Sequence, residues 1–598
     1  MSLACFRNWI VVFVLALFSL GSVAFAQSPE EDAQKPLTVA NQLREMIEPF
    51  VSSGGGAAPV LQMEGLQVQL HKDLISFYRQ RGYRPAWFHD GRVTPVAQQW
   101  IARVQGVAAE GLRPADYHVA TLATCLELAH LSQSYGVQCD PTGLALLDLL
   151  LSDSFLKFVS HLINGRVDPV QLYAAEWQSA VSAIDAVGVL HQVLRKGEVA
   201  AVLEEILPYR AGYQRLAVYL AHYRQLALGG GWPVLADGPP VRPGDRDARL
   251  PALRRFLVLV GDLESSRQSS GWRMDAVTVA ALKRFQVRHG LRADGVLGKD
   301  TLAQINVPVG RRIEQLGLNL ERERWPKQDA GDRYLQVDIT DFTLTLVDGG
   351  REIMRMPVVV GTSFRRTPVF SALMTYLVFA PYWTVPPTIL EQDKLPVIKA
   401  NPDYLDSHHY EIVAWGKDPN RTIDAASIDW KTITAKSFPG MLRQKPGPWN
   451  PLGKVKFMFP NAYHVYLHDT PAQYLFAKQQ RTFSSGCIRI ARPLELAIYL
   501  LDGQKGWDSE RIKKEMAASK PYTVRLKNPI PVHILYRTAW VDVQGRLQFR
   551  NDVYERDQEL QAALKQRPES SGQMAEVTMQ VGGEAADRPS ESESGLVR

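Results

Sequence analysis

The spacing of hydrophobic residues changes near Tyr334, and this change limits the folds that the chain can adopt. Between about 60 and 310, apolar residues recur every three or four positions, which is typical of helices. From Tyr334 onward they alternate with polar residues, as Phe342, Leu344 and Leu346 do, which is typical of strands. A length of 598 residues is also too great for a single core. We therefore expect a multidomain α+β protein, helical in its N-terminal part and mostly β in its C-terminal part.

Glycine, proline and local composition mark the expected domain boundaries. A Gly/Pro-rich stretch at about 229–244 separates two helical regions, and a segment rich in Pro, Lys and Trp interrupts the later strand pattern. Three short apolar repeats with Gly turns predict a small three-helix bundle. The expected divisions are a linker at 27–59, a helical scaffold domain at 60–245, the bundle at 246–310, a mostly-β domain at 330–540 with a lid inserted at about 386–450, and a disordered tail at 565–598.

The first 26 residues have the features of an export signal. Arg7 precedes an apolar run from Trp9 to Leu20, and Ala24-Phe25-Ala26 offers a small-x-small cleavage site. If this segment is not cleaved, it would instead tether the chain to a membrane. In either case we expect the remainder to face an extracytoplasmic space, and we predict a periplasmic location.

Cysteine usage singles out one thiol. Removal of the signal takes away Cys5 and leaves Cys125, Cys139 and Cys487, an odd number that predicts one pair and one free thiol in an exported protein. Cys125 and Cys139 are close enough in sequence to be bridged, although spacing alone does not prove the connection. Cys487 is then the thiol that is left over.

Cys487 lies nineteen residues after His468, and the two are the parts of a Cys/His acyl-transfer site. We expect a strand at Tyr463–His468 whose alternation turns Tyr466 and His468 together toward a cleft. Gly486 would let the backbone approach closely, the Cys487 N–H would point at a reacting oxygen, and a protonated histidine nearby would lower the thiol pKa. Taken singly, however, such a cysteine is more often a small buried hydrophobe, and such a histidine is more often structural.

The motif around Cys487 resembles the signature of the L,D-transpeptidase (YkuD-like) family. That signature is a histidine followed by Ser/Thr-x-Gly-Cys-x-Arg, and this chain reads VYLHDTP at 465–471 and SSGCIRI at 484–490. Many members have His-Gly before the cysteine where this chain has Ser485-Gly486. Further segments resemble the large multidomain periplasmic branch, in which a helical scaffold and a peptidoglycan-binding bundle precede the catalytic domain: Val359-Val360-Gly361, Arg366-Thr367-Pro368, Pro381 to Thr388, Pro451-Leu452-Gly453, Lys456-Phe457, the bundle at 281–301 and, less specifically, 60–245.

This resemblance implies acyl transfer on peptidoglycan stem peptides. Cys487 would attack the carbonyl of the third-position diamino acid of a donor tetrapeptide, release D-alanine and keep the acyl group as a thioester. His468 would take the thiol proton and later the proton of the acceptor amine. Since Asp469 is expected to point to the other strand face, a backbone carbonyl should orient the imidazole. The residues implied for oxyanion stabilisation or substrate binding are Gly486, Tyr466, Ser485, Arg489 and Trp383.

Two of these roles have a structural alternative. Arg489 would either bind a substrate carboxylate or form a structural ion pair. Trp383, like the lid residues Trp415, Trp430 and Trp449, would either line the donor groove or pack in a core.

The sequence leaves the acceptor open. With a stem amine as acceptor the enzyme would be a transpeptidase that forms 3→3 cross-links, and with water it would be an L,D-carboxypeptidase. With a protein lysine as acceptor it would anchor a lipoprotein. The alternative that is not an enzyme is a non-catalytic wall-binding scaffold. The expected partners are peptidoglycan stems and other wall-synthesis proteins, and carbapenems are expected to acylate Cys487. We expect no cofactor or metal, because His408-His409 lacks a ligand-like spacing. We expect no nucleic acid, because a net charge of +6 is mild for this length.

Overall fold

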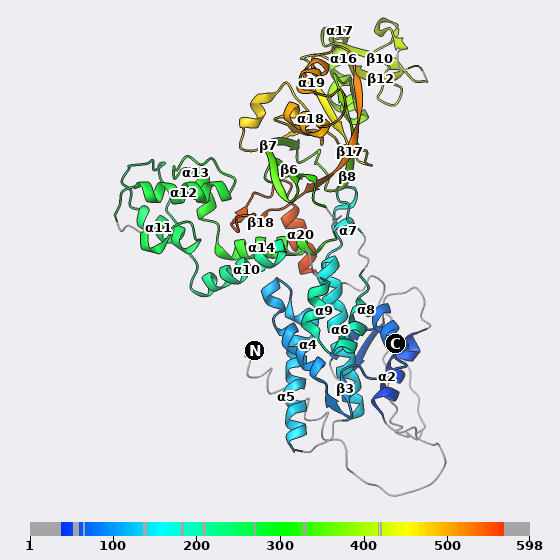
Figure 1. Cartoon of the computed structure of the whole chain (residues 1–598), viewed down its shortest axis with the longest axis vertical. Coiled ribbons are helices and arrows are strands. Elements are labelled where there is room, and N and C mark those ends of the chain that lie inside the picture. The colour runs from blue at the N-terminus through cyan, green and yellow to red at the C-terminus, as the bar shows by residue number, and fades with distance from the viewer. Residues whose placement is uncertain are drawn as a thin grey trace, which may run out of the picture.

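The computed structural model describes residues 38–51, 59–63, 66–135, 140–180, 184–206, 211–267, 271–326, 331–416, 418 and 421–566. The expected export signal, Cys139 and almost all of the expected tail lie outside these residues, so the predictions for them are not tested. Figure 1 shows an elongated molecule with its helical N-terminal part at one end, its β-rich part at the other and a small helical bundle projecting to one side. None of the described helices is long and apolar enough to span a membrane.

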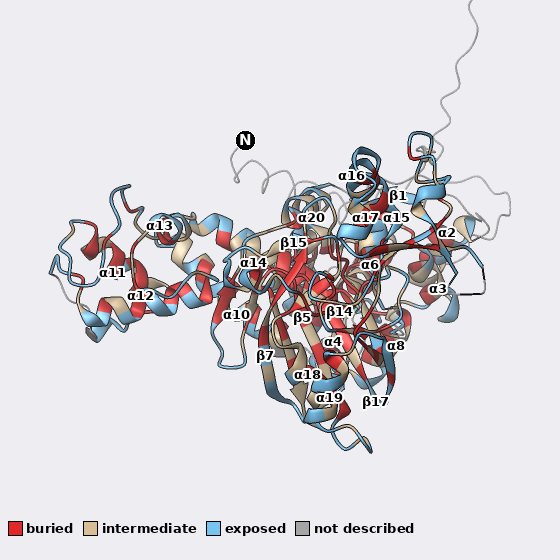
Figure 2. Cartoon of the chain, turned by 90° about the horizontal axis from the view of Figure 1, so that it is seen from above, coloured by how far each residue is buried: buried red, intermediate tan, exposed pale blue. Residues whose placement is uncertain are grey.

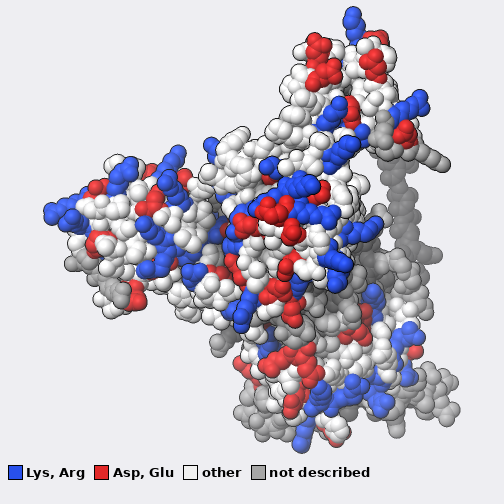
Figure 3. Space-filling view, turned by 45° about the horizontal axis from the view of Figure 1, so that its top comes forward, with Lys and Arg blue, Asp and Glu red and all other residues white. Residues whose placement is uncertain are grey.

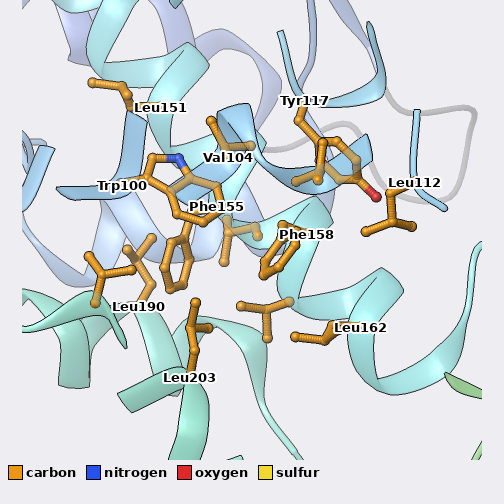
Figure 4. Packing of buried hydrophobic residues seen from close by; sticks show 14 of the residues in the cluster. Trp100, Val104, Leu112, Tyr117, Leu151, Phe155, Phe158, Leu162, Leu190 and Leu203 are labelled. Atoms are coloured by element: carbon orange, nitrogen blue, oxygen red, sulfur yellow. The ribbon is translucent and has the colours of Figure 1, made fainter. Parts of the chain in front are cut away.

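The N-terminal region is built around one long helix, α6 (Pro141–Asn164), which is buried over most of its length. Asp140 caps this helix by accepting the Gly143 N–H. The ring of Phe155 meets Trp100 edge-on at 4.9 Å, within the cluster drawn in Figure 4. The helical prediction is confirmed, with two short hairpins added. The surrounding elements are α3 (Lys72–Gln80), α4 (Pro95–Gln105), α5 (Val119–Tyr135), α8 (Ala186–Lys196), α9 (Val199–Glu205), the hairpin of β1 (Val60–Met63) with β2 (Leu66–Gln69) and that of β3 (Phe88–His89) with β4 (Arg92–Val93).

The prediction of a linker at 27–59 is wrong for part of that segment. Helix α2 (Val39–Ile47) forms there, with Thr38 as its cap. Apolar residues three and four positions apart give this helix one face that packs in the scaffold core, and those buried residues are Leu43, Met46 and Ile47.

The expected three-helix bundle is present as α11 (Leu250–Leu259), α12 (Ala276–Arg288) and α13 (Lys299–Ile305). Its core holds, among others, Leu253, Leu282, Phe285 and Ile305. Helix α14 (Val309–Arg324) leads away from the bundle and packs along α10 (Ala211–Leu228), so the bundle is joined to the scaffold by a helix pair.

The β-rich part is a sheet that closes on itself into a barrel, because β6 pairs with both β5 and β7. The strand order is β15-β7-β16-β14-β13-β8-β17-β5-β6. Buried residues line these strands, and the strands labelled in Figure 2 carry red, buried segments. The elements are β5 (Tyr334–Asp338), β6 (Thr343–Asp348), β7 (Arg351–Gly361), β8 (Ser371–Phe379), β13 (Val455–Met458), β14 (Leu467–His468), β15 (Thr482–Ser484), β16 (Ile488–Ile490), β17 (Tyr522–Leu535) and two covering helices, α18 (Pro493–Leu501) and α19 (Ser509–Met516).

The expected strand Tyr463–His468 is wrong at its beginning, because only Leu467–His468 is extended and paired. The Asn461 side chain donates to the Phe459 and Val465 carbonyls at 2.6 and 2.7 Å and accepts from two backbone N–H groups. An asparagine that satisfies the backbone in this way replaces strand pairing with a turn. His464 accordingly has a positive φ of 55°.

The expected lid is a subdomain with a sheet and a core of its own. Its four strands run in the order β11-β10-β12-β9, and its core includes Ile398, Tyr410, Ile412 and Leu442. The elements are β9 (Trp383–Thr384), α15 (Pro387–Ile389), the π-helical turn η6 (Leu390–Lys394), α16 (Leu395–Ala400), α17 (Tyr404–Ser407), β10 (Tyr410–Ala414), β11 (Thr422–Ile423) and β12 (Gly440–Gln444).

The chain continues past the expected domain boundary at 540 and returns to the junction of scaffold and barrel. There the hairpin of β18 (Ala539–Val541) and β19 (Leu547–Phe549) packs in the scaffold core, and α20 (Arg556–Lys565) follows. Tyr554, between hairpin and helix, is buried in the barrel core. Figure 1 shows this C-terminal segment (β18 to α20) in the middle of the molecule.

Charged side chains of both signs are intermingled on the face of the molecule that Figure 3 draws. Figure 3 shows Lys and Arg alternating with Asp and Glu over the drawn face. The net charge of +6 is therefore not gathered into a single basic stripe on that face.

Candidate active site

The pairing of three short strands brings the predicted site residues together. Strands β14 and β16 are parallel, with His468 opposite Arg489, and Lys456 of β13 is opposite His468 on the other side. The Ile488 N–H donates to the Tyr466 carbonyl at 3.1 Å, so the same register continues to Tyr466 and Cys487. Residues opposite each other on neighbouring strands share a face of a sheet. One face of the barrel wall therefore carries the following set: Lys456, Tyr466, His468, Cys487 and Arg489.

His468 is buried, and a backbone carbonyl holds its ring as expected. Nδ1 lies 2.6 Å from the Asp469 carbonyl oxygen. A carbonyl only accepts, so Nδ1 carries the proton and Nε2 keeps a free lone pair. Burial, together with the charges of Arg489 and Lys456, lowers the His468 pKa to about 3, so the imidazole is neutral near pH 7.

The Asp469 carboxylate organises the neighbouring turn. It accepts the Thr470 N–H at 2.7 Å and the Lys454 N–H at 2.8 Å. Gly453 makes room for it, since a Cβ atom there would lie 2.4 Å from Asp469 Oδ2. Asp469 therefore acts on His468 through its backbone oxygen.

The thiol of Cys487 is neutral as well. Burial raises its pKa above the ordinary value, and a hydrogen bond with Tyr466 and the charges of Lys456 and Arg489 only partly offset this. The expectation that a protonated histidine lowers the thiol pKa is therefore wrong. The resting site holds a thiol and a neutral imidazole, because burial disfavours both charges.

The loop before Cys487 is held by hydroxyl groups. Gly486 has a φ of 110°, a conformation that favours glycine. Its N–H donates to Ser484 Oγ at 3.2 Å, and its carbonyl accepts a hydrogen bond from Thr367 Oγ1 at 2.8 Å. The Gly486 N–H is thus already used inside the loop, so the oxyanion stabilisation implied for Gly486 does not come from its N–H.

Three comparisons with known proteins bear on this site. Residues 332–508 match the family model of the L,D-transpeptidase catalytic domain, residues 253–305 that of a "Putative peptidoglycan binding domain", and residues 72–220 that of a scaffold domain. A Haemophilus influenzae protein named "Putative L,D-transpeptidase" is 35% identical over 227 residues, which are 38% of this chain and 45% of that protein. The chain thus spans less than half the length of this relative. Residues 332–508 are an L,D-transpeptidase catalytic domain.

Similar solved structures carry the same family name. An L,D-transpeptidase from Stackebrandtia nassauensis is 15% identical, with 51% of this chain and 97% of that chain covered and a TM-score of 0.20. An L,D-transpeptidase from Mycobacterium smegmatis is 13% identical, with 34% and 58% covered and a TM-score of 0.17.

Arg489 and Lys456 bring two partly buried positive charges to the L,D-transpeptidase site. Burial lowers the pKa of both, and both interact electrostatically with Cys487. Within the described part of the chain, Arg489 Nε is buried without a hydrogen-bond partner. The ion pairs of the described residues do not include Arg489, so the structural alternative for this residue finds no support there. Lys456 belongs to a segment that resembles the family, but its place in the site could not be predicted, because only its strand partner brings it here.

Ser485 and Trp383 connect the L,D-transpeptidase domain to its lid. Ser485 Oγ accepts a hydrogen bond from Arg365 at 3.1 Å, and Arg365 pairs with Asp393 of the lid at 2.7 Å. Trp383 begins the lid sheet, with the Lys394 ammonium 5.7 Å from its ring.

The other lid tryptophans differ in exposure. Trp430 is buried in the lid core, whereas Trp415 is 64% exposed. Trp449 stacks on His409. Among the described residues no cluster of histidine, cysteine and carboxylate side chains is suited to hold a metal ion.

The proposed pairing of Cys125 is not tested. Cys125 is half-buried in α5, and Cys139 lies outside the described residues.

Proposed function

We propose that this protein is a peptidoglycan L,D-transpeptidase that forms 3→3 cross-links through a thioester on Cys487. The observation that carries this proposal is the parallel register of β14 and β16, which sets His468 and Cys487 on one face of the barrel wall. The match to the L,D-transpeptidase catalytic domain supports it, and the match of residues 253–305 supports peptidoglycan as the partner.

Acylation is the first half of the proposed reaction. His468 Nε2 takes the Cys487 proton as the sulfur attacks the carbonyl carbon of the third residue of a donor stem. The Cys487 N–H and the Tyr466 hydroxyl stabilise the tetrahedral oxyanion; the loss of one such donor typically costs ~10²–10³ in rate. The C–N bond then breaks, the proton passes from His468 to the leaving amine, and D-alanine departs.

Transfer to the acceptor is the second half. The side-chain amine of a second stem attacks the thioester while His468 Nε2 takes its proton. The new amide forms, the C–S bond breaks and the proton returns to sulfur. The imidazole is unprotonated at the start of each half, so Nε2 is free to accept a proton in both.

Lys456 and Arg489 recognise a carboxylate of the donor stem in this proposal. A carboxylate that is removed from water is stabilised by charge-assisted hydrogen bonds. Both cations interact with Cys487, so the carboxylate they bind lies close to the scissile bond.

The experiment that tests this function follows the products of a disaccharide-tetrapeptide by mass spectrometry. The full chain should yield a cross-linked dimer with loss of D-alanine, and a carbapenem should add its whole mass to Cys487. The Cys487→Ser variant should give neither product while keeping the circular dichroism of the wild type. Tripeptide without dimer would identify a carboxypeptidase, and dimer formation by Cys487→Ser would place the nucleophile elsewhere.

The remaining alternatives are separated by the same measurement. A lipoprotein lysine as acceptor would appear as transfer to a lysine peptide but not to a second stem. An unreactive thiol together with binding to isolated peptidoglycan would identify a wall-binding scaffold. Since peptidoglycan is an extracytoplasmic polymer, the proposal includes action in the periplasm after export.

A further inference from the structure

A pair of buried hydroxyl groups lies directly behind the loop that carries Cys487. Thr367 Oγ1 accepts the Gly361 N–H at 2.9 Å and donates to the Gly486 carbonyl at 2.8 Å. Tyr554 Oη donates to the Gly361 carbonyl at 2.7 Å and accepts the Thr367 N–H at 3.2 Å. Both residues are fully buried, so these bonds are protected from water.

These hydroxyls occupy the place where two strands would otherwise continue to pair. Strands β7 and β16 are antiparallel, with Val359 opposite Arg489, and the same register would place Gly361 opposite Cys487. Both backbone groups of Gly361 instead bond to the hydroxyls of Thr367 and Tyr554. The ladder therefore ends before Cys487, which leaves the strand and enters the loop.

The bond from Thr367 determines where the Cys487 N–H points. A peptide unit is planar and trans, so its N–H is antiparallel to its C=O. Because the Gly486 carbonyl is directed at Thr367, the Cys487 N–H is directed away from Thr367. The neighbouring Gly486 N–H bonds to Ser484 Oγ, so of these two N–H groups it is that of Cys487 that the loop offers to a substrate.

The C-terminal segment supports this arrangement. Tyr554 lies far beyond residues 332–508, the range that matches the catalytic domain. Its ring stacks on Tyr536 at 5.7 Å, the Tyr536 hydroxyl accepts the Tyr554 N–H at 2.9 Å, and the Arg556 guanidinium lies 5.4 Å from the ring.

We propose that Thr367 and Tyr554 are positioning residues that aim the Cys487 N–H as the oxyanion donor, so that the C-terminal segment is part of the active site. This inference rests on the proposed function, since it assigns a role within the same acyl transfer. It goes beyond that function by giving a catalytic purpose to a segment outside the matched domain.

The test compares two small reagents that react with the same thiol. p-Nitrophenyl acetate forms a C–S bond through a tetrahedral oxyanion as its ester C–O bond breaks and p-nitrophenolate leaves. Iodoacetamide forms a C–S bond by direct displacement of iodide, with no oxyanion. The first rate is read as p-nitrophenolate release above the Cys487→Ser background, and the second as alkylation of the Cys487 peptide by mass spectrometry.

The expected result is a selective loss of acylation. Thr367→Val and Tyr554→Phe should lower the p-nitrophenyl acetate rate about tenfold or more, since removal of an oxyanion donor costs ~10²–10³ and a misdirected donor less. The iodoacetamide rate should change less than about twofold. Thr367→Ser, which keeps the hydroxyl, should retain most of the acylation rate. Tyr117→Phe, which removes another buried tyrosine hydroxyl within the scaffold, is the matched control and should leave both rates unchanged.

Other outcomes would overturn the inference. If both reagents slow in parallel, the hydroxyls only maintain the fold; if neither slows, or if Thr367→Ser behaves like Thr367→Val, the hydroxyl does not aim the donor. Neither reagent resembles peptidoglycan, so these rates test the inference even if the wild type forms no cross-links. Failure of the proposed function would instead appear in the disaccharide-tetrapeptide experiment alone.

Discussion

The thiol and the imidazole of this site are both neutral at rest, and the reason is their burial. His468 has a pKa of about 3, and the pKa of Cys487 is raised. A thiolate therefore forms only when the proton moves to Nε2 during attack, or at high pH. Lys456 and Arg489 lower the cost of that charge, since each interacts favourably with a thiolate.

The pH dependence of thiol alkylation follows from these two shifts. Because the Cys487 pKa lies above its ordinary value, the thiolate fraction should grow about tenfold per pH unit between about pH 6 and pH 8. Because the His468 pKa lies below its ordinary value, no inflection should appear near pH 6.5. The measurement is the rate at which iodoacetamide alkylates Cys487 at several pH values. A rate that is already level at pH 6 would mean a preformed thiolate–imidazolium pair.

Lys456 should govern the affinity for a donor with a free carboxylate. A charge-assisted hydrogen bond is worth about 1.5–3 kcal/mol, so Lys456→Met should raise KM about tenfold or more and change kcat less. Lys454→Met, which removes an exposed lysine two residues away, is the matched control. With a donor whose carboxylate is amidated, Lys456→Met and wild type should have similar KM values. An equal rise in KM with the amidated donor would point to lost packing instead.

At the residue scale, the local sequence motif predicts the reacting side chains but not the residues that surround them. Cys487 and His468 could be predicted from the motif, and strand alternation indicates that a backbone carbonyl holds the His468 ring without saying which one. Lys456 and Thr367 lie in segments that resemble the family, but their roles could not be predicted, because only contacts between segments distant in sequence bring them to the site. The neutral charge state could not either, since it depends on burial.

At the scale of elements, the lid is coupled to the nucleophile loop by one arginine. Arg365 bonds to Ser485 and to Asp393 and Gln392 of the lid, at distances between 2.7 and 3.1 Å. These groups are partly exposed, so the ion pair contributes only about 0–1 kcal/mol to stability. Its effect is to hold η6 near the loop.

Loss of this contact should loosen the lid without unfolding the protein. Arg365→Met should leave the melting temperature nearly unchanged, because exposed ion pairs stabilise little. Amide hydrogen exchange in η6 and α16 should become faster, since the lid is then tied to the barrel by fewer bonds. The check is hydrogen exchange followed by mass spectrometry. Unchanged exchange in these two helices would show that the lid is held by its own core.

Helices and strands whose apolar residues recur with a clear period could be predicted. Elements whose conformation depends on the hydrogen bonds of one side chain could not. The bundle helices and the strands from Tyr334 onward follow the apolar spacing. The strand expected at Tyr463–His468 fails because Asn461 satisfies the backbone on its own. Nothing in the alternation of Tyr463 to Leu467 reveals that competing turn.

At the scale of the whole molecule, Arg556 joins the scaffold to the barrel. Its guanidinium is fully buried, lies within 5.5 Å of four ring centroids and donates to Glu176 at 2.9 Å. The rings belong to two parts of the molecule: Tyr173 and Trp177 come from the scaffold side, and Tyr536 and Tyr554 from the C-terminal side.

Removal of this cation should weaken the junction. Arg556→Ala should lower the free energy of unfolding by about 3–5 kcal/mol, because it leaves a cavity among the rings and removes their cation–π contacts. Arg546→Ala, which breaks an exposed pair with Asp542, should cost less than about 1 kcal/mol. Urea unfolding of both variants measures the difference in the free energy of unfolding. Equal losses would show that Arg556 does not stabilise the contact between scaffold and barrel.

Domain order could be predicted from composition, but the ends of the domains could not. The linker at 27–59 contains α2, and the chain beyond 540 returns to pack on both neighbours. Local composition indicates how polar a segment is and whether it contains turn residues. It does not indicate that these short segments are ordered by a few apolar contacts with distant parts of the chain.

The position of Tyr554 has a consequence for biosynthesis. A ribosome releases the nucleophile well before the hydroxyl that braces its loop, since Cys487 precedes Tyr554 in the chain. A nascent polypeptide would thus carry its cysteine in a loop that lacks this support until the segment around Tyr554 packs behind it. Competence for acyl transfer would arrive only after the segment around Tyr554 has been synthesised and has packed behind the loop, which delays premature modification of that sulfur.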